Sequence, residues 1–281
     1  MSLYNRNIYK HVKTRKSMSL RLNQLSEAFK EFYGQNVKQM PILIAEGRIP
    51  LSVDGLMQRR LDVRNASDDV KSAWIGNYFD TGDAVVYHPD GRVKIVLDSQ
   101  TLREMNPDSK RNAGALILTQ EQYDAIPGEE FKKGKLGKVN NDLSKKEVKA
   151  HPVWKALARN QSLLNDYADY IFAVGKQRFG YDTAMGVYPS SAQGETPEMR
   201  AWYVSGLGLM SDVNGRDYLD GDYGRFAGVA PEAQSAKISG VGNVKAYTMA
   251  DVQGAVSELK ALEKLVRPEA LGKIRSLVKK L

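Results

Sequence analysis

The stretch DAVVYHPDGRVKIVLD, residues 83–98, carries the clearest structural signal in this chain. An apolar run over 84–87 is followed by Pro89-Asp90-Gly91, and then by a second, nearly alternating run over 93–97. Proline presets the backbone of a turn, and glycine supplies the positive φ that a tight connection needs. The stretch therefore predicts a β-hairpin.

Residues on the N-terminal side of the hairpin indicate helices. Apolar side chains recur at steps of three and four over residues 17–33, and Gly34 follows as a C-terminal cap, so this segment predicts a helix. The segment Gln39 to Glu46 fits either a short helix begun at Pro41 or a buried strand. Ser52 is a good N-cap for a helix over 53–61.

On the C-terminal side, short helices and strands alternate with turn residues. Ser99, Thr119 and Ser144 each stand where a helix N-cap is expected, the last two within capping boxes. The remaining predicted elements are a strand at 116–118, helices at 152–158 and 162–179, strands at 184–189 and 199–206, and helices within 248–281.

These elements predict the α+β class, with helices flanking a small mixed or antiparallel sheet and two subdomains. The regular βαβ alternation of a doubly wound sheet is absent from the sequence pattern. We expect a basic arm at 1–16, a helical and hairpin half at 17–145, and a Gly/Asp-rich, β-containing half at 146–281.

Composition excludes several classes of protein. The 281 residues are 42% hydrophobic and 26% charged, which is ordinary for a folded globular protein. The chain has no cysteine, so disulfides, cysteine-ligated metals and cysteine nucleophiles are excluded. No apolar run is long enough to span a membrane, and no apolar stretch follows the basic N-terminus as in a secretory signal. We expect a cytoplasmic protein with no cofactor.

The distribution of charge gives the strongest functional indication. The net charge is +8, and a basic balance favours a polyanionic partner such as nucleic acid. The arm 1–16 carries +5 with no acid, and residues 129–160 carry nine basic side chains and four acids. The predicted contact residues are Lys10, Lys13, Arg15, Lys16, Lys132, Lys133, Lys135 and Lys138. Nearby aromatic residues suited to base stacking are Tyr4, Tyr9, Phe131 and Trp154. Core packing explains such aromatics as well, and it is the better interpretation for Trp154, which stands on a predicted helix.

An acidic, glycine-rich run follows at residues 212–225. Oxygen ligands separated by glycines suit a hard cation, and Asp217, Asp220 and Asp222 are the candidate ligands. The spacing does not match the EF-hand, which requires glycine at the sixth position and glutamate at the twelfth. Two Asx turns explain the same residues, and so does a loop that forms the rim of a binding site for a polar ligand.

Other motifs are weaker. Asp80, Asp83, His88 and Asp90 could surround a cation at the mouth of the hairpin, but turn-forming aspartates explain them as well. Glu195 with Glu198 offers a carboxylate pair, as any chain with 33 acids does. The chain contains two G-x-G tripeptides, neither of which completes a dinucleotide fingerprint.

Three functional hypotheses follow from these residues, and they leave open whether the protein is an enzyme. The first is non-enzymatic binding of nucleic acid or another polyanion. The second is a hydrolase that uses carboxylates or a bound cation in the Gly/Asp-rich half. The third is a structural or assembly protein that forms homo-oligomers through its C-terminal helices.

Overall fold

The computed structural model describes residues 19–24 and 26–231. The chain divides into two compact units, residues 1–233 and 234–281, and every described residue belongs to the first. The basic arm of residues 1–16 and the helices predicted within 248–281 lie outside the described residues.

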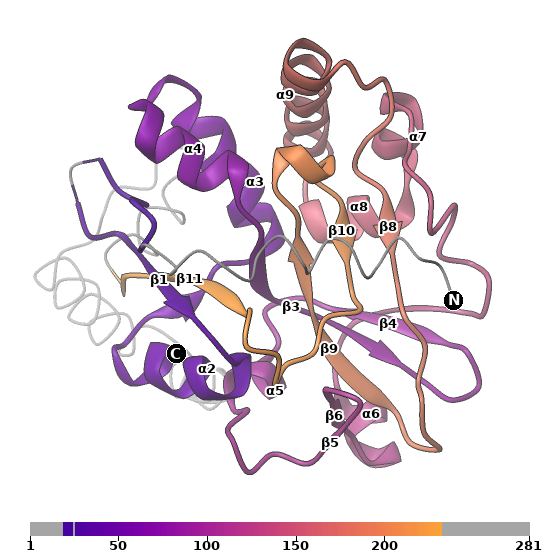
Figure 1. Ribbon diagram of the computed structural model, residues 1–281. Helices are drawn as coiled ribbons and strands as arrows, with labels where there is room; N and C mark the ends of the chain where they lie inside the picture. Colours follow the sequence, from indigo (N-terminus) through magenta and orange to yellow (C-terminus); the bar gives the residue numbers. More distant parts are fainter. Residues whose placement is uncertain (1–18, 25, 232–281) are drawn as a thin grey trace, which may run out of the picture. The chain divides into compact units, whose positions relative to one another are not determined.

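The described strands form one mixed sheet of eleven strands (Figure 1). Its main path runs, in spatial order, through β1 (Phe29–Tyr33), β11 (Arg225–Val229), β3 (Phe79–Tyr87), β9 (Glu198–Val204), β10 (Val213–Asn214) and β8 (Val187–Tyr188). The shorter strands beside this path are β2 (Ile49–Pro50), β4 (Val93–Val96), β5 (Arg111–Asn112), β6 (Ala115–Ile117) and β7 (Glu129–Phe131). The α+β class is confirmed, but the prediction of a small sheet is wrong, because β3 pairs with β4, β9 and β11 and so joins distant parts of the chain.

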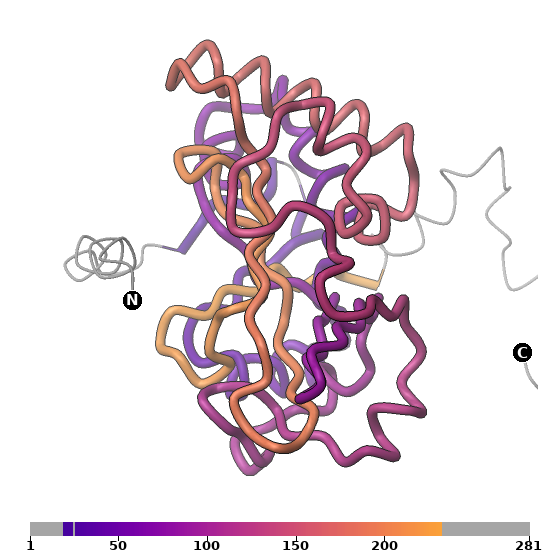
Figure 2. Tube along the Cα trace, turned by 90° about the vertical axis from the view of Figure 1, so that its right-hand side faces the viewer, coloured from indigo at the N-terminus to yellow at the C-terminus, as the bar shows by residue number. Residues whose placement is uncertain are grey.

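Helices cover both faces of this sheet (Figures 1 and 2). One face is covered by α3 (Val53–Asp62), α4 (Asp68–Gly76), α7 (Lys145–Ala150), α8 (Pro152–Ala158) and α9 (Gln161–Phe179). The other face is covered by α2 (Asn36–Ala45), α5 (Gln100–Arg103) and α6 (Gln120–Ala125). Two 3₁₀ turns, η1 (Val63–Asn65) and η2 (Leu207–Leu209), complete the described elements.

Strand β3 is buried along its whole length. Val85 and Tyr87 pack into the core beneath α3, α8 and α9, whereas Ala84 and Val86 pack into the core beneath α2 and α5. Because successive side chains of a strand point to opposite faces, a strand between two helical layers is apolar at nearly every position. This explains why the 84–87 run of the hairpin is continuous and does not alternate.

The local predictions around the hairpin are confirmed. β3 and β4 pair antiparallel, the His88 N–H donates to the Arg92 carbonyl at 2.9 Å, and Gly91 has φ +92°. The capping serines and threonine also behave as predicted: Ser52, Ser99, Thr119 and Ser144 each accept a hydrogen bond from a backbone N–H in the first turn of their helix. The segment Gln39 to Glu46 is helical and not a strand, but the predicted start at Pro41 is wrong, because α2 begins at Asn36 and Pro41 lies inside it.

The helix predicted over 17–33 is wrong. Residues 19–24 are not helical, and Phe29–Tyr33 form β1, which pairs antiparallel with β11. Phe29 packs edge-on against Trp74 with the ring centroids 5.0 Å apart, whereas Phe32 belongs to the core on the other side of the sheet. A spacing of three places two residues on one face of a helix but on opposite faces of a strand. Here both faces are buried, so the pattern imitates a helix.

Within the described residues, none of the helices is long and apolar enough to cross a membrane.

Candidate functional site

The lysines predicted to bind a polyanion lie in the loop that follows β7. Lys132, Lys133 and Lys135 are exposed, and none of the three pairs with an acid among the described residues. The Lys133 side chain lies over Gly91 in the β3–β4 turn, where an added Cβ would come within 2.8 Å of it. We name Lys132, Lys133 and Lys135 the lysine loop. Its charges face solvent at the tip of the hairpin.

Lys138 differs from the lysine loop. Its Nζ lies 3.0 Å from the Glu147 carboxylate, and its backbone carbonyl lies 3.0 Å from Nε2 of the buried His151. Lys138 is therefore ion-paired with a residue in the first turn of α7. Trp154 is fully buried and donates to the Met185 carbonyl at 2.6 Å, so it belongs to the core and is not available for base stacking. Lys10, Lys13, Arg15, Lys16 and the neighbouring tyrosines lie outside the described residues.

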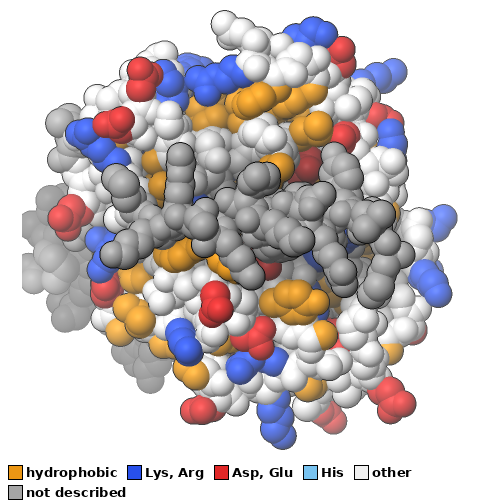
Figure 3. All heavy atoms as spheres, viewed as in Figure 1, with side chains coloured by type: hydrophobic (Ala, Val, Ile, Leu, Met, Phe, Trp, Pro, Cys, Tyr) orange, Lys and Arg blue, Asp and Glu red, His pale blue; other side chains and the backbone are white. Residues whose placement is uncertain are grey.

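The remaining surface does not gather positive charge on the face that Figure 3 shows. There, the visible lysine and arginine side chains are interspersed with aspartate and glutamate. Several of the described lysines are ion-paired, among them Lys30 with Glu46, and Lys145 and Lys149 with Asp169. A net positive charge therefore does not by itself locate an interface, and the lysine loop differs from these ion-paired lysines in having no acidic partner among the described residues.

The aspartates of the Gly/Asp-rich loop have three different partners, of which two lie in other parts of the fold. The Asp217 carboxylate accepts the Tyr218 N–H, Asp220 pairs with Arg111 of β5 at 3.4 Å, and Asp222 accepts from Gln35 before α2. Burial raises the pKa of Asp217. Within residues 19–24 and 26–231, no three His, Asp or Glu side chains lie close enough to hold a metal ion together.

Arg200 and Tyr218 shape this loop, and the sequence pattern does not single them out for that role. From β9, the Arg200 guanidinium donates to the carbonyls of Asp217 at 2.7 Å and Ala113 at 2.6 Å, and it stacks over the Tyr218 ring at 5.2 Å. Tyr218 is 53% exposed and covers Gly114, where any side chain would collide with its ring. The loop thus presents the Tyr218 side chain at the surface.

The residues proposed around the mouth of the hairpin are spread along it. Asp80 accepts the Arg225 N–H and Asp83 accepts the Val53 N–H, both inside the sheet. Asp90 pairs with His88 and Arg92 in the turn at the other end of β3. At about 3.3 Å per residue, Asp80 and Asp90 are separated by roughly 25 Å of strand. Glu198 is buried against Asn112 and Gly194, while Glu195 is exposed.

Asp212, at the start of the Gly/Asp-rich run, gives a pH-dependent prediction. Its Oδ1 accepts the Gly186 N–H at 2.7 Å, and burial raises its pKa to about 7. An unfolded aspartate ionises near pH 4, so between about pH 4 and pH 7 the unfolded state loses this proton while the folded state keeps it. The stability that Asp212 contributes is therefore present below pH 4 and lost as the pH rises to 7.

Asp212→Asn removes this titration and keeps an oxygen for Gly186. We expect equal stability of the two proteins near pH 4. Above pH 7 the variant should be more stable by about 2 kcal/mol, a value discounted from the full shift because Asp212 is partly exposed. Urea unfolding across this pH range measures the difference, and a difference independent of pH would contradict the assignment.

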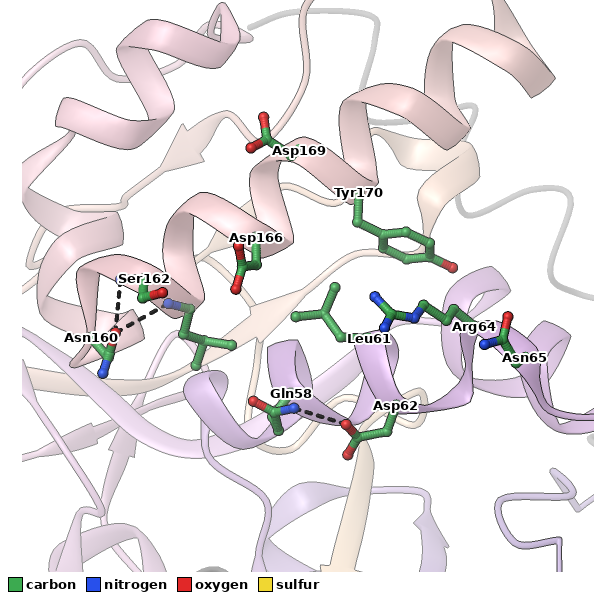
Figure 4. A pocket seen from close by; sticks show the side chains of 11 residues that line it. Gln58, Leu61, Asp62, Arg64, Asn65, Asn160, Ser162, Asp166, Asp169 and Tyr170 are labelled. Atoms are coloured by element: carbon green, nitrogen blue, oxygen red, sulfur yellow. Dashed lines mark hydrogen bonds between the residues drawn. The ribbon is translucent and has the colours of Figure 1, made fainter. Parts of the chain in front are cut away.

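A groove lies between α3 and α9 and is lined by residues of both helices and of η1 (Figure 4). Its volume is about 930 Å³. None of its lining residues belongs to a motif that predicts a function, because they come from two segments about 100 positions apart in the sequence. Only the packing of α3 against α9 brings them together.

Comparison with known proteins identifies the fold. No family model matches this chain, and no curated protein does. One solved structure, described as "Accommodation of massive sequence variation in Nanoarchaeota by the C-type lectin fold", matches with a TM-score of 0.55 and 17% sequence identity, over 74% of this chain and 99% of the other. The fold is similar to the C-type lectin fold. At this level of identity the likeness concerns the fold alone and leaves the ligand open.

The C-type-lectin-like fold places the candidate residues in two settings. The lysine loop, the β3–β4 turn and the Tyr218 loop lie in connections at the margins of the sheet, whereas Asp80, Asp83 and Arg200 lie within its strands. In folded proteins, binding residues are often located on loops that a rigid scaffold holds in position.

Proposed function

We propose that this protein is a non-enzymatic binding protein for a polyanion, with nucleic acid as the first candidate, and that the lysine loop contacts phosphate groups. The observation that carries the proposal is the grouping of Lys132, Lys133 and Lys135 on one short connection, exposed and without acidic partners among the described residues. An unpaired lysine keeps its charge available for phosphate, while an ion-paired lysine must first lose its partner.

The basic arm extends this proposal. Lys10, Lys13, Arg15 and Lys16 carry no neighbouring acid in sequence, so they would add phosphate contacts of the same sequence-independent kind. Lys138 contributes less, because Glu147 already neutralises it.

Two further observations support binding without catalysis. The aspartates of the Gly/Asp-rich loop hold neighbouring elements in place, which suits a structural role for their carboxylates. The solved neighbour is described as accommodating massive sequence variation by the C-type lectin fold. By analogy, the buried sheet of this chain would support the fold, and the side chains on its surface would determine which ligand is bound.

The proposal is tested by neutralising the lysine loop with Lys132→Gln, Lys133→Gln and Lys135→Gln together. Binding to fluorescent single-stranded RNA and duplex DNA is measured by anisotropy between about 50 and 200 mM salt. If each lysine contacts one phosphate, the slope of log affinity against log salt should fall by about three, and affinity at low salt by about tenfold or more.

The matched control removes three ion-paired lysines, with Lys30→Gln, Lys145→Gln and Lys149→Gln. It changes the net charge by the same amount but should leave the salt slope close to that of the wild type. Equal weakening by the two triple variants would assign binding to overall charge and contradict the lysine loop as the interface. Wild-type binding that does not respond to salt would contradict the polyanion proposal altogether.

A further inference from the structure

The groove between α3 and α9 has an apolar floor. Leu61 from the last turn of α3 and Leu163 from the first turn of α9 lie at its base, and Leu61 is only 9% exposed. Figure 4 shows the Leu61 side chain rising between the two helices. A floor of this kind can bury methylene groups of a ligand, which favours binding in proportion to the apolar area covered.

Two opposite charges face each other across this floor. In Figure 4 the Asp166 carboxylate points from α9 towards α3, the Arg64 guanidinium points from η1 towards Leu61, and Leu61 lies between them. Neither the Arg64 side chain nor the Asp166 side chain forms a hydrogen bond or ion pair with another residue in the described part of the chain. The other charged residues of the groove differ, because Asp169 is held by Lys145 and Lys149, and Asp62 accepts from Gln58.

Tyr170 forms the wall above Arg64 in the same view. Its ring is half-buried, and burial raises the pKa of its hydroxyl. A tyrosine hydroxyl is neutral near pH 7 even without such a shift, and it can donate a hydrogen bond. At the other end, Asn160 uses its Oδ1 to accept the Ser162 and Leu163 N–H groups and fixes the start of α9. The groove is therefore cationic and aromatic at one end, apolar in the middle and anionic at the other end.

We infer that this groove binds a zwitterion whose ammonium and carboxylate groups are separated by an aliphatic chain, as in an ω-amino acid or a C-terminal lysine. The ammonium pairs with Asp166, the methylene chain lies on Leu61 and Leu163, and the carboxylate meets the planar guanidinium of Arg64, whose geometry suits a two-point contact. The assignment is independent of the polyanion proposal, because it uses neither the lysine loop nor net charge.

The test is a titration of ¹⁵N-labelled full-length protein with 6-aminohexanoate, followed by amide chemical shifts. We expect shifts at the end of α3, at η1 and along the first half of α9, with a dissociation constant of about 1–10 mM, since both ion pairs are solvent-exposed. Glycine and 4-aminobutanoate serve as shorter probes, and we expect both to bind more weakly because a shorter chain covers less of the apolar floor and holds its two charges closer together.

Three variants separate a binding role from a structural one. Arg64→Gln and Asp166→Asn should each weaken binding about fivefold or more, while Asp169→Asn, whose carboxylate points away from α3 in Figure 4, should leave it unchanged. Arg64 and Asp166 are exposed, so both variants should retain the wild-type thermal unfolding midpoint. That readout shows that any loss of binding does not come from loss of the fold.

The two sources of this chemistry are distinguished with a short peptide that ends in lysine and the same peptide with an amidated end. Binding of the first and not of the second supports a protein C-terminus as the ligand, and binding of 6-aminohexanoate alone supports a free ω-amino acid. The inference is overturned if no groove resonance moves up to about 50 mM 6-aminohexanoate. It is also overturned if Asp169→Asn weakens binding as much as Asp166→Asn does.

Discussion

Replacing Arg60 by methionine is expected to lower the free energy of unfolding by about 4 kcal/mol or more. Arg60 lies on α3 and is completely buried. Its guanidinium donates five hydrogen bonds, to the carbonyls of Trp74, Asn77 and Ser205 and to the hydroxyls of Tyr167 and Ser211. These acceptors come from α4, α9 and the segments around η2, so a single side chain joins four parts of the fold.

The size of the effect follows from what methionine would leave behind. It matches the arginine stem in length but donates nothing, so buried carbonyls and hydroxyls lose their partners, at about 1–3 kcal/mol for each group that stays unsatisfied. Partial rearrangement keeps the total below the sum. Urea unfolding measures the loss, and Arg64→Met serves as the control.

Arg64 lies four positions along the chain from Arg60 and is exposed without a partner among the described residues. The control should therefore change stability by less than about 0.5 kcal/mol. Equal effects of the two substitutions would mean that the buried hydrogen bonds of Arg60 contribute little to stability.

Arg159→Met is expected to destabilise the protein by about 3 kcal/mol at pH 8 and by much less at pH 4. The Arg159 guanidinium lies 2.7 Å from the Asp83 carboxylate, which has no solvent exposure, and it also contacts Asp98 and Asp54. Burial raises the pKa of Asp83 to about 6 even though Arg159 lowers it. Without Arg159, this pKa should rise further.

The pH dependence has a definite sign. Below about pH 4 Asp83 is protonated in both the folded and the unfolded state, so the absence of its partner matters little. As the pH rises, the unfolded state releases the proton freely, whereas the folded variant must keep it or bury an unpaired carboxylate. Stability of the variant should therefore fall more steeply with pH than that of the wild type.

The double variant Arg159→Met with Asp83→Asn provides the control. The introduced amide retains one oxygen for the Val53 N–H, which Asp83 accepts at 2.7 Å, and it carries no charge. We expect the extra pH dependence to disappear in the double variant, although the loss of the second acceptor costs some stability at every pH. A pH dependence that persists in the double variant would show that a group other than Asp83 causes it.

The start of each capped helix was predictable because a cap depends on residues within three positions of each other. Ser52, Ser99, Thr119 and Ser144 hydrogen-bond as their sequence contexts predict. The β3–β4 hairpin was predictable for the same reason, since the proline and the glycine of its turn are separated by a single residue.

The strand character of Phe29–Tyr33 was not predictable from its own residues. Whether Phe29 and Phe32 share a face depends on whether the chain is helical or extended, and pairing with β11 nearly 200 positions away decides this. The arginines of α3 make the same point. Adjacent in sequence, Arg59 and Arg60 both suit the end of a helix, yet Arg60 is fully buried and Arg59 only half-buried.

The candidate sites divide in the same way. The exposure of the lysine loop could be anticipated from its charge density, and its sequence suffices to name the residues. The sequence could not show that Asp217, Asp220 and Asp222 have three different partners, because Gln35 and Arg111 are distant from them in sequence. The Arg64–Asp166 groove forms no motif and exists only where α3 packs against α9.

By itself, the sequence determined the α+β class, the hairpin, the helix caps and the lysines of the exposed loop, all of which depend on short-range hydrogen bonding or on the cost of burying charge. The tertiary structure alone decided the eleven-stranded sheet, the conversion of residues 29–33 into a strand, and the partners of each buried charge. The physical reason is that these features arise from contacts between segments far apart in the chain, whose energies no local pattern records.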